Sequence, residues 1–394
     1  TGDVIEYDYN NSGSVNKIAF ITARTNSRHF TVRSLTDSAP AQCSTADTDW
    51  AVYRAYTSLD DAEAGDENTG CTLFGSSLTD SGNMDLVTDN TQWNIACYSN
   101  GTTADGGGVF VSGWTTGPYN YITIFTPTAP AEVGTTQRHS GVWDTTKYHM
   151  RFTTTSSGGI YFHDAYGRVD GLQISVYDVD DIRPNIAISS VGEASVEYRF
   201  SNNILRDESH TSNGGGIRIQ PDSAFELGKA YIKAWNNIIY GFLDQSGVRS
   251  YAGLMTMYVY NNTVYNCGRG ISGNGVAYNN IVYNCSNPFN GSFSASSDNN
   301  ITDQDGEAPN ATFSTSALSV SFVNVTDEDF HLSPMDETAR DRGYDLSSDL
   351  TLAVTLDIDG ETRPAGDGYD IGADEAAVAI FRSVGPGSTS ALTE

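Results

Sequence analysis

The densest group of side chains that could do acid–base chemistry has one arginine, two carboxylates and one histidine within five positions. Its members are Arg206, Asp207, Glu208 and His210. A polysaccharide lyase needs a base beside carboxylates, and a glycoside hydrolase needs two carboxylates about 5 to 10 Å apart. The group offers both kinds of residue. The competing interpretation is a polar loop whose charged side chains are simply hydrated.

Two further groups could bind or catalyse. His163, Asp164 and Asp170 form a second candidate, although Asp170 precedes Gly171 and also fits a turn in which its side chain bonds its own backbone. Three acids alternate along one segment and could bind calcium, but their spacing is not that of an EF-hand, and a solvated acidic turn explains them equally. They are Asp178, Asp180 and Asp181. None of these groups identifies a reaction, so we expect a protein that is not an enzyme. We expect no cofactor other than this candidate calcium.

Five cysteines lie outside any Cys-x-x-Cys or Cys/His spacing, so a zinc site is not expected. Cys267 and Cys285 hold the same place in two consecutive sequence repeats. If these repeats are stacked strands about 4.8 Å apart, a disulfide could join the two cysteines, and two stacked thiols would fit as well. Cys43 and Cys71 are the other pair that could be joined.

A repeat built on pairs of asparagines dominates residues 195–303. Successive pairs are spaced by 34, 25, 18 and 20 residues, with short apolar strands on both sides. Asparagine tolerates the left-handed backbone of a sharp corner, and its amide can bond the equivalent amide one coil away. Coils of this length predict an all-β fold, a right-handed parallel β-helix, rather than an Asn-rich antiparallel sandwich. The predicted ladder of amides consists of Asn203, Asn237, Asn262, Asn280 and Asn300.

The chain begins and ends differently from this repeat. Strand patterns at Val4–Asp8, Ile18–Thr22 and Phe30–Val32, separated by Asn/Ser/Gly turns, predict a small antiparallel module over the N-terminal end of the helix. Ser58 and Gly65 predict the start and stop of a short α-helix. We expect the module at 1–75, the β-helix at 76–335, an irregular cap at 336–379 and a tail at 380–394.

Charge and composition exclude several classes of protein. The 394 residues contain 49 Asp and Glu against 21 Lys and Arg, a net charge of −28, so nucleic acid is not an expected partner. No apolar run reaches 18 residues, so no membrane span is expected. This acidity would repel an anionic polysaccharide unless calcium intervened, although exposed Tyr and Trp could stack on glycans. The acidic, lysine-poor composition predicts an extracellular protein at a cell or virion surface.

Four segments resemble the right-handed parallel β-helix proteins of the pectate-lyase-like superfamily: Tyr53–Leu59, Trp93–Tyr98, Gln137–Gly141 and Arg168–Ile174. Asp357–Pro364, followed by the Asp-Ile-Gly-Ala-Asp-Glu motif at 370–375, resembles the closing motif of secreted or surface-anchored members. The resemblance implies the fold. It leaves the activity open, because the superfamily contains lyases, hydrolases, tailspikes, adhesins and structural proteins.

The resemblance also concerns the two ends of the chain. In similar surface proteins, a segment like Phe381–Leu392 comes just before one like Gly2–Asp8. This order implies a tail that completes the N-terminal module of the next copy, and head-to-tail contacts of this kind make filaments. The residues expected to join are Phe381, Val384, Leu392, Val4 and Ile5. A disordered tail or a chain cut between tandem modules are the other interpretations. We expect a self-assembling structural subunit, with a polysaccharide lyase or hydrolase, or a trimeric tailspike-like adhesin, as the alternatives.

Overall fold

The computed structural model describes residues 2–26, 28–34, 38–43, 49–73, 84–129, 136–153, 159–177, 184–188, 196–210, 214–219, 230–251, 255–304, 308–309 and 319–376. The predicted calcium candidates Asp178, Asp180 and Asp181 lie outside these residues, as do Phe381, Val384 and Leu392. No helix among the described residues is long and apolar enough to cross a membrane.

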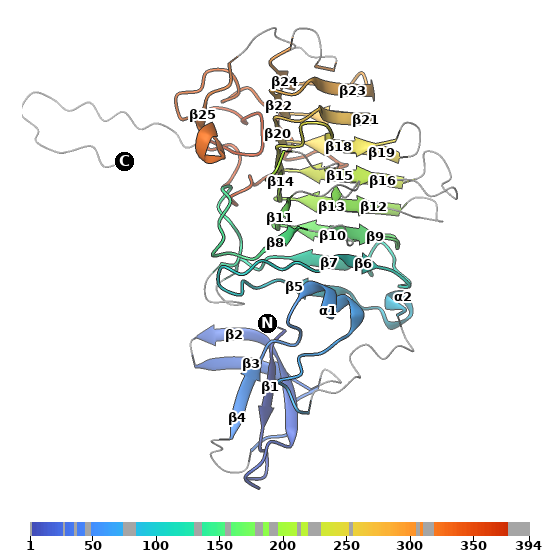
Figure 1. Ribbon diagram of the computed structural model, residues 1–394, viewed down its shortest axis with the longest axis vertical. Helices are drawn as coiled ribbons and strands as arrows, with labels where there is room; N and C mark the ends of the chain where they lie inside the picture. The colour runs from blue at the N-terminus through green and yellow to red at the C-terminus, as the bar shows by residue number, and fades with distance from the viewer. Residues whose placement is uncertain are drawn as a thin grey trace, which may run out of the picture.

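The predicted small module is a four-stranded antiparallel sheet in the order β3-β2-β1-β4. Its strands are β1 (Val4–Tyr7), β2 (Lys17–Asn26), β3 (His29–Arg33) and β4 (Trp50–Tyr53). The predicted short helix follows as α1 (Leu59–Ala64), which starts at Ser58, whose side chain accepts the Asp61 N–H, and stops at Gly65 with a φ of 75°. Figure 1 shows the module and α1 at the end of the solenoid where β5 lies.

From β5 to β24 the described chain winds through three strand faces in turn, and strands of consecutive coils pair in parallel. Face 1 contains β5 (Trp93–Ala96), β7 (Ile122–Phe125), β10 (Gly167–Asp170), β13 (Val196–Ser201), β16 (Ala230–Trp235), β19 (Met255–Tyr260) and the second half of β21 (Arg269–Tyr278). Face 2 contains β6 (Val109–Val111), β9 (Ile160–Phe162), β12 (Pro184–Ile188), β15 (Gly215–Ile219), β18 (Ser246–Ser250), the first half of β21, and β23 (Asn287–Phe293). Face 3 contains β8 (His149–Phe152), β11 (Gln173–Val176), β14 (Ile204–Asp207), β17 (Ile238–Tyr240), β20 (Thr263–Tyr265), β22 (Ile281–Tyr283) and β24 (Ile301–Thr302). The predicted parallel β-helix is confirmed.

Each face contributes a column of buried apolar residues to one continuous core. On face 1 the column includes Val169, Phe200, Ala234 and Val259, which pair strand to strand. Because side chains alternate across a strand, the residues between them point outward. Burying one such apolar side chain contributes about 1.5–3 kcal/mol, so the stacked columns hold the coils together.

The corner between faces 1 and 3 is the predicted asparagine ladder. Each Nδ2 donates to the Oδ1 of the next rung, over 2.9 Å from Asn203 to Asn237, 2.9 Å from Asn237 to Asn262, 3.0 Å from Asn262 to Asn280, and 2.8 Å from Asn280 to Asn300. All five side chains are fully buried. The first asparagine of each pair takes the left-handed conformation that turns the corner, with φ between 52° and 56°.

Face 3 is covered on its outer side by the C-terminal segment, residues 319–376, which includes β25 (Phe322–Asn324), the 3-10 turn η1 (Val325–Asp327) and β26 (Asp329–Leu332). Phe330, Ile358 and Ala373 pack on Ile204 and Ile238. Figure 1 shows this segment beside the face-3 strands. Among the described residues the last coil strand is β24, which ends at Thr302, and β25 and β26 pair antiparallel with each other. The expected boundaries of the β-helix at 76 and 335 stay a prediction.

Candidate functional site

Three cationic side chains occupy one register position on consecutive strands of face 1. Arg168 on β10 is paired with Arg199 on β13, and Arg199 with Lys233 on β16. Their chain neighbours Val169, Phe200 and Ala234 are fully buried, so the three cations lie on the outer surface of the sheet. Adjacent parallel strands are about 4.8 Å apart, so the three positive charges lie close to one another. Such a cluster of basic residues is unexpected on a protein with a large negative net charge.

One carboxylate partly neutralises this cationic column. Glu197 bonds the Arg199 Nε and the Lys233 Nζ, each at 2.5 Å. Although burial raises the pKa of Glu197, hydrogen bonds from Lys233 and Arg199 hold it below its ordinary value, so the group is ionised. Within the column itself, three cations against one carboxylate leave an excess of two positive charges, although Asp3, Asp60, Asp105 and Asp170 line the cleft around it.

Arg168 carries most of that excess, because no carboxylate of the described residues forms a salt bridge with it. Its guanidinium lies 3.3 Å from the centre of the Tyr121 ring. Burial lowers the pKa of Arg168, and the neighbouring Arg199 lowers it further. An arginine remains charged under these conditions, so Arg168 is a cation that an incoming anion would stabilise.

The outer surface around Arg168 and Arg199 forms the floor of a cleft of about 1220 Å³. Strands β5, β7, β10 and β13 line one side, and the N-terminal module with the start of α1 lines the other. Arg54 stacks 3.8 Å from the Tyr98 ring and forms a 2.7 Å ion pair with Asp3. Trp235, at the end of β16, adds a half-buried aromatic surface. The cleft therefore combines cations with flat aromatic rings.

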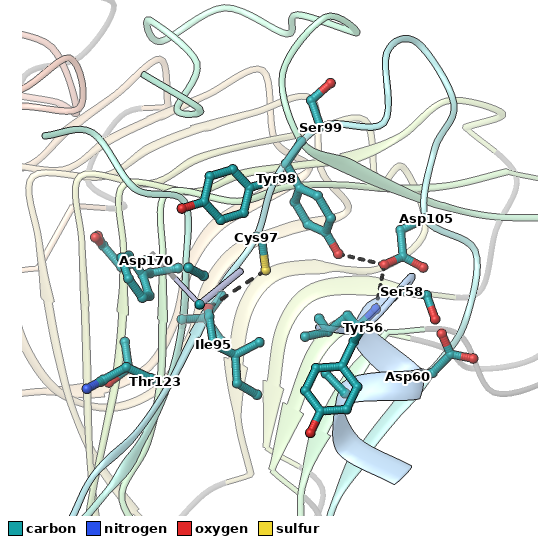
Figure 2. Close-up of a pocket in the computed structure, with 18 of the residues that line it drawn as sticks. Tyr56, Ser58, Asp60, Ile95, Cys97, Tyr98, Ser99, Asp105, Thr123 and Asp170 are labelled. Carbon is teal, nitrogen blue, oxygen red and sulfur yellow. Dashed lines mark hydrogen bonds between the residues drawn. The ribbon is translucent and has the colours of Figure 1, made fainter. Parts of the chain in front are cut away.

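The side of the cleft nearest α1 is a structural junction. Asp105 accepts hydrogen bonds from the Leu59 N–H and the Tyr148 hydroxyl, each at 2.8 Å, and Figure 2 shows it between the solenoid and the start of the helix. Cys97 lies in the same view, and burial raises the pKa of its thiol far above the ordinary value. This end of the cleft holds the module in place and offers no reactive thiolate.

The second candidate group is divided between two corners of the coil. Asp170 reaches the cleft, where it accepts bonds from Arg138, from Ser201 Oγ (2.8 Å) and from Asn202 Nδ2 (2.6 Å). Asp164 lies in the turn before β10, where it accepts the Trp114 N–H at 2.9 Å, and its neighbour His163 faces Phe110. The strand β10 separates them, so they do not form one site.

The Arg206 group forms a network that joins three parts of the chain. Arg206 bonds Glu208 at 2.7 Å and Glu328 at 2.8 Å, and stacks 3.8 Å from the Trp143 ring. Burial raises the pKa of Glu208, but hydrogen bonds from Arg151 and Arg206 lower it overall. The interpretation of these residues as a hydrated loop is therefore wrong, because their charges hold the C-terminal segment and the Trp143 loop on face 3.

The other two members of that group close a turn. The buried Asp207 accepts the N–H groups of Ser209 and His210, each at 3.0 Å. His210 Nδ1 lies 3.1 Å from the Gly241 carbonyl. Neither side chain faces the cleft, and the group supports no catalytic assignment.

All five cysteines are free thiols, so neither predicted disulfide is present. Cys267 and Cys285 stack in consecutive coils, with the Cys267 N–H donating to the Cys285 sulfur over 3.4 Å. Cys71 instead contacts Glu6, at 3.1 Å, and Cys43 contacts the Asp8 carbonyl. The alternative of two stacked thiols describes the first pair.

One group has ligand atoms close enough for a metal: His331, Asp359 and Asp374 lie within 4.8 Å of one another. The His331 ring is hydrogen-bonded on both nitrogens, to Asp329 at 2.6 Å and to Asp359 at 3.0 Å. Burial would lower the pKa of His331, but the Asp359 bond and the charges of Asp374 and Asp359 raise it to about 10. The imidazolium itself supplies the cation among these acids, so the residues do not fit a metal site.

The cationic column was not predicted from the sequence, although the spacing of two of its residues from the asparagine ladder indicates it. Arg199 and Lys233 each precede a ladder asparagine, Asn203 and Asn237, by four positions. Residues at one offset from the ladder must lie in one column, since the ladder fixes the register. Arg168 has no such asparagine after it, so only the strand pairing places it with them.

Comparison with known proteins finds a solved structure with a loose similarity to this chain. No protein-family model and no curated protein matches the sequence. Among solved structures, the chain is similar to the crystal structure of pectate lyase Pel9A, with 12% sequence identity over 72% of this chain and 86% of that one and a TM-score of 0.30. The fold is a parallel β-helix. The order and parallel pairing of the strands carry this statement, since the superposition is too loose to support an argument. The resemblance of residues 370–375 to a closing motif stays a prediction.

Proposed function

We propose that the protein binds an acidic glycan in the cleft over face 1. The observation that carries this proposal is the stack of Arg168, Arg199 and Lys233, in which Glu197 bonds Arg199 and Lys233 and no carboxylate of the described residues forms a salt bridge with Arg168. Arg168 and Arg199 line the cleft, whereas Lys233 is buried beside it. Arginine matches carboxylates in a planar, two-bonded geometry, and desolvation strengthens such bonds. The rings of Tyr121 and Trp235 offer stacking surfaces beside these charges.

The net charge of −28 would repel an acidic glycan from the cleft only if the negative charge were spread evenly over the protein surface. Local fields within a cleft outweigh distant charges, because salt screens interactions beyond about 8 Å under physiological conditions. Four carboxylates, Asp3, Asp60, Asp105 and Asp170, also line the cleft, and Asp3 and Asp170 are paired with Arg54 and Arg138. The proposal therefore places the acidic group of the glycan at Arg168 and Arg199. Cleavage of the bound chain is not part of the proposal. An extracellular location, where such polymers occur, is proposed with it.

The test compares one glycan with and without its charge. Binding of de-esterified oligogalacturonate and of the same oligomer fully methyl-esterified would be measured by calorimetry, with alginate and hyaluronan oligomers as further acidic probes. We expect an acidic oligomer to bind more tightly than the methyl-esterified one. Arg168→Gln should weaken the binding of the acidic oligomer about tenfold or more, because it removes a charged hydrogen bond. Arg249→Gln is the matched control, because Arg249 also stacks on a tyrosine, Tyr251, but on face 2. Equal binding of both forms, no binding of any acidic oligomer, or equal effects of the two variants would contradict the proposal.

Head-to-tail assembly into a filament is the second candidate. It is supported by the edge strands β3 and β4, which have no second partner among the strands described and carry the exposed residues Phe30, Trp50 and Val52. The expected junction at Val4 and Ile5 needs correction, because β1 is already paired with β2 and β4. A donated strand would have to join β3 or β4. Electron microscopy of the full chain, of a chain lacking residues 377–394 and of Val52→Lys would test this; monomers in all three would count against it.

A further inference from the structure

The loop between β1 and β2 places oxygen-bearing residues at alternate positions. Counting from Asp8, positions 1, 3, 5, 7 and 9 are Asp8, Asn10, Ser12, Ser14 and Asn16, and position 6 is Gly13. An EF-hand calcium loop takes side-chain ligands at positions 1, 3, 5 and 9 and a carbonyl at position 7, with glycine at position 6 for the sharp turn. Gly13 has a φ of 82°, as that turn requires.

The oxygens of this loop converge on one point. The Asn16 Nδ2 occupies it, 2.7 Å from Asp8 Oδ1, 2.5 Å from Asn10 Oδ1 and 3.3 Å from Ser12 Oγ. The Ser14 carbonyl faces the same side, 3.3 Å from Ser12 Oγ. A partly positive amide group therefore stands inside a shell of oxygens contributed by ligand-spaced residues.

Asp8 is fully buried, residues 9–14 of the loop are exposed, and Asn16 is half-buried. Burial raises the pKa of Asp8, but backbone N–H bonds from Gly13 and Asn10 lower it below its ordinary value, so the loop surrounds a carboxylate. We propose that this loop binds a calcium ion at the point that the Asn16 amide occupies. Its ligands would be the side chains of Asp8, Asn10 and Ser12 and the Ser14 carbonyl. The Asn16 Oδ1, which accepts the Tyr9 N–H at 3.0 Å, would join them once the amide turns over and its Nδ2 leaves the point. A donor set made only of oxygens suits calcium and not zinc.

One departure from the EF-hand sets the affinity. Position 12, which supplies a two-oxygen glutamate in an EF-hand, is Ala19, a buried residue of β2. With a single carboxylate, the site belongs with the weak extracellular modules, which bind calcium with dissociation constants of about 0.1 to 1 mM. This site is separate from the cleft, so its test does not depend on the glycan.

The test adds one carboxylate inside or just outside the ligand spacing. Metal-free full-length protein would be titrated with calcium by calorimetry, and with terbium followed by the emission sensitised by the adjacent Tyr9. Ser12→Asp, at position 5, should tighten calcium binding about tenfold, since affinity rises with the number of charged ligands. Asn11→Asp adds the same charge one residue away, at an exposed position that is not a ligand, and should change binding less than about threefold.

The outcomes separate a built site from a simple polar turn. Saturable binding in the natural chain, tightened by Ser12→Asp and weakened by Asn16→Ala, supports the proposal. Equal effects of Ser12→Asp and Asn11→Asp would mean that general charge attracts the ion. No binding by either the natural chain or Ser12→Asp up to about 10 mM calcium, well above the weakest modules of this kind, would overturn it.

Discussion

The side-chain amide of Asn279 pairs with the backbone of Tyr344 in both directions. Its Nδ2 donates to the Tyr344 carbonyl at 2.9 Å, and its Oδ1 accepts the Tyr344 N–H at 2.8 Å. Asn236 and Asn261 likewise donate to carbonyls of the C-terminal segment. The two asparagines of each pair thus have different roles: the second forms the buried ladder, and the first turns the corner. From Asn236 onward the first asparagine also holds the C-terminal segment, whereas Asn202 bonds Asp170 instead.

Replacing Asn279 by glycine should loosen that segment without disturbing the coils. Glycine keeps the left-handed backbone, so the change removes the two bonds to Tyr344 and one long bond, 3.4 Å, to Asn261 in the neighbouring coil. We expect a loss of about 1–2 kcal/mol in unfolding free energy and faster hydrogen exchange at the Tyr344 amide. Unchanged exchange there would show that other contacts hold the segment.

Asn280→Ala should be far more damaging, although Asn280 is the next residue. Its Nδ2 donates to Asn300, Val259 and Tyr278, and its Oδ1 accepts from Asn262, all in the dry interior. Unpaired buried groups cost about 1–3 kcal/mol each, so chemical denaturation should show a loss of at least about 3 kcal/mol. Asn274→Ala, which removes one bond at the surface, is the control and should cost under about 1 kcal/mol. Similar losses in both variants would mean that the ladder adds little.

The ion pairs of His331 with Asp329 and Asp359 predict that the protein loses stability at alkaline pH. Its pKa in the folded protein is about 10, against an ordinary value of 6.5. A base whose pKa is raised by folding contributes stability that is complete below pH 6.5 and is lost as the pH rises through about 10. Thermal unfolding between pH 7 and pH 10 should therefore show a decline that is shallower in His331→Gln. If the natural protein and His331→Gln lost stability in parallel as the pH rises, the loss would not come from His331.

The cysteine assignment predicts a simple thiol count. Cys43 is exposed and the other four cysteines are buried, so a thiol reagent should modify one group rapidly in the native protein. Unfolding without a reductant should release five. A total of three would reveal one disulfide and contradict the stacked thiols of Cys267 and Cys285.

The asparagine repeat was decisive in the sequence because its consequence is local and periodic. A pair of asparagines at coil spacing specifies a corner, a ladder and therefore the register of every strand beside it. The short helix after Ser58 was predictable for the same reason, since its N-cap and its stop lie within eight residues. The antiparallel pairing of the Phe330 strand was not predictable, because apolar alternation looks the same in a coil strand and in the pair of β25 and β26.

The candidate functional residues likewise differ in whether the sequence alone could bring them together. The sequence by itself determined the fold, and it brought Arg206 and Asp207 to notice because they are neighbours in the chain. Only the tertiary structure decided that Arg206 is held by Glu208 and Glu328, while Arg168 and Arg199, 31 positions apart, lie side by side in a cleft. The physical reason is that a solenoid turns separation by one coil into contact about 4.8 Å away. Charges that are dilute along the chain become a concentrated column on its surface.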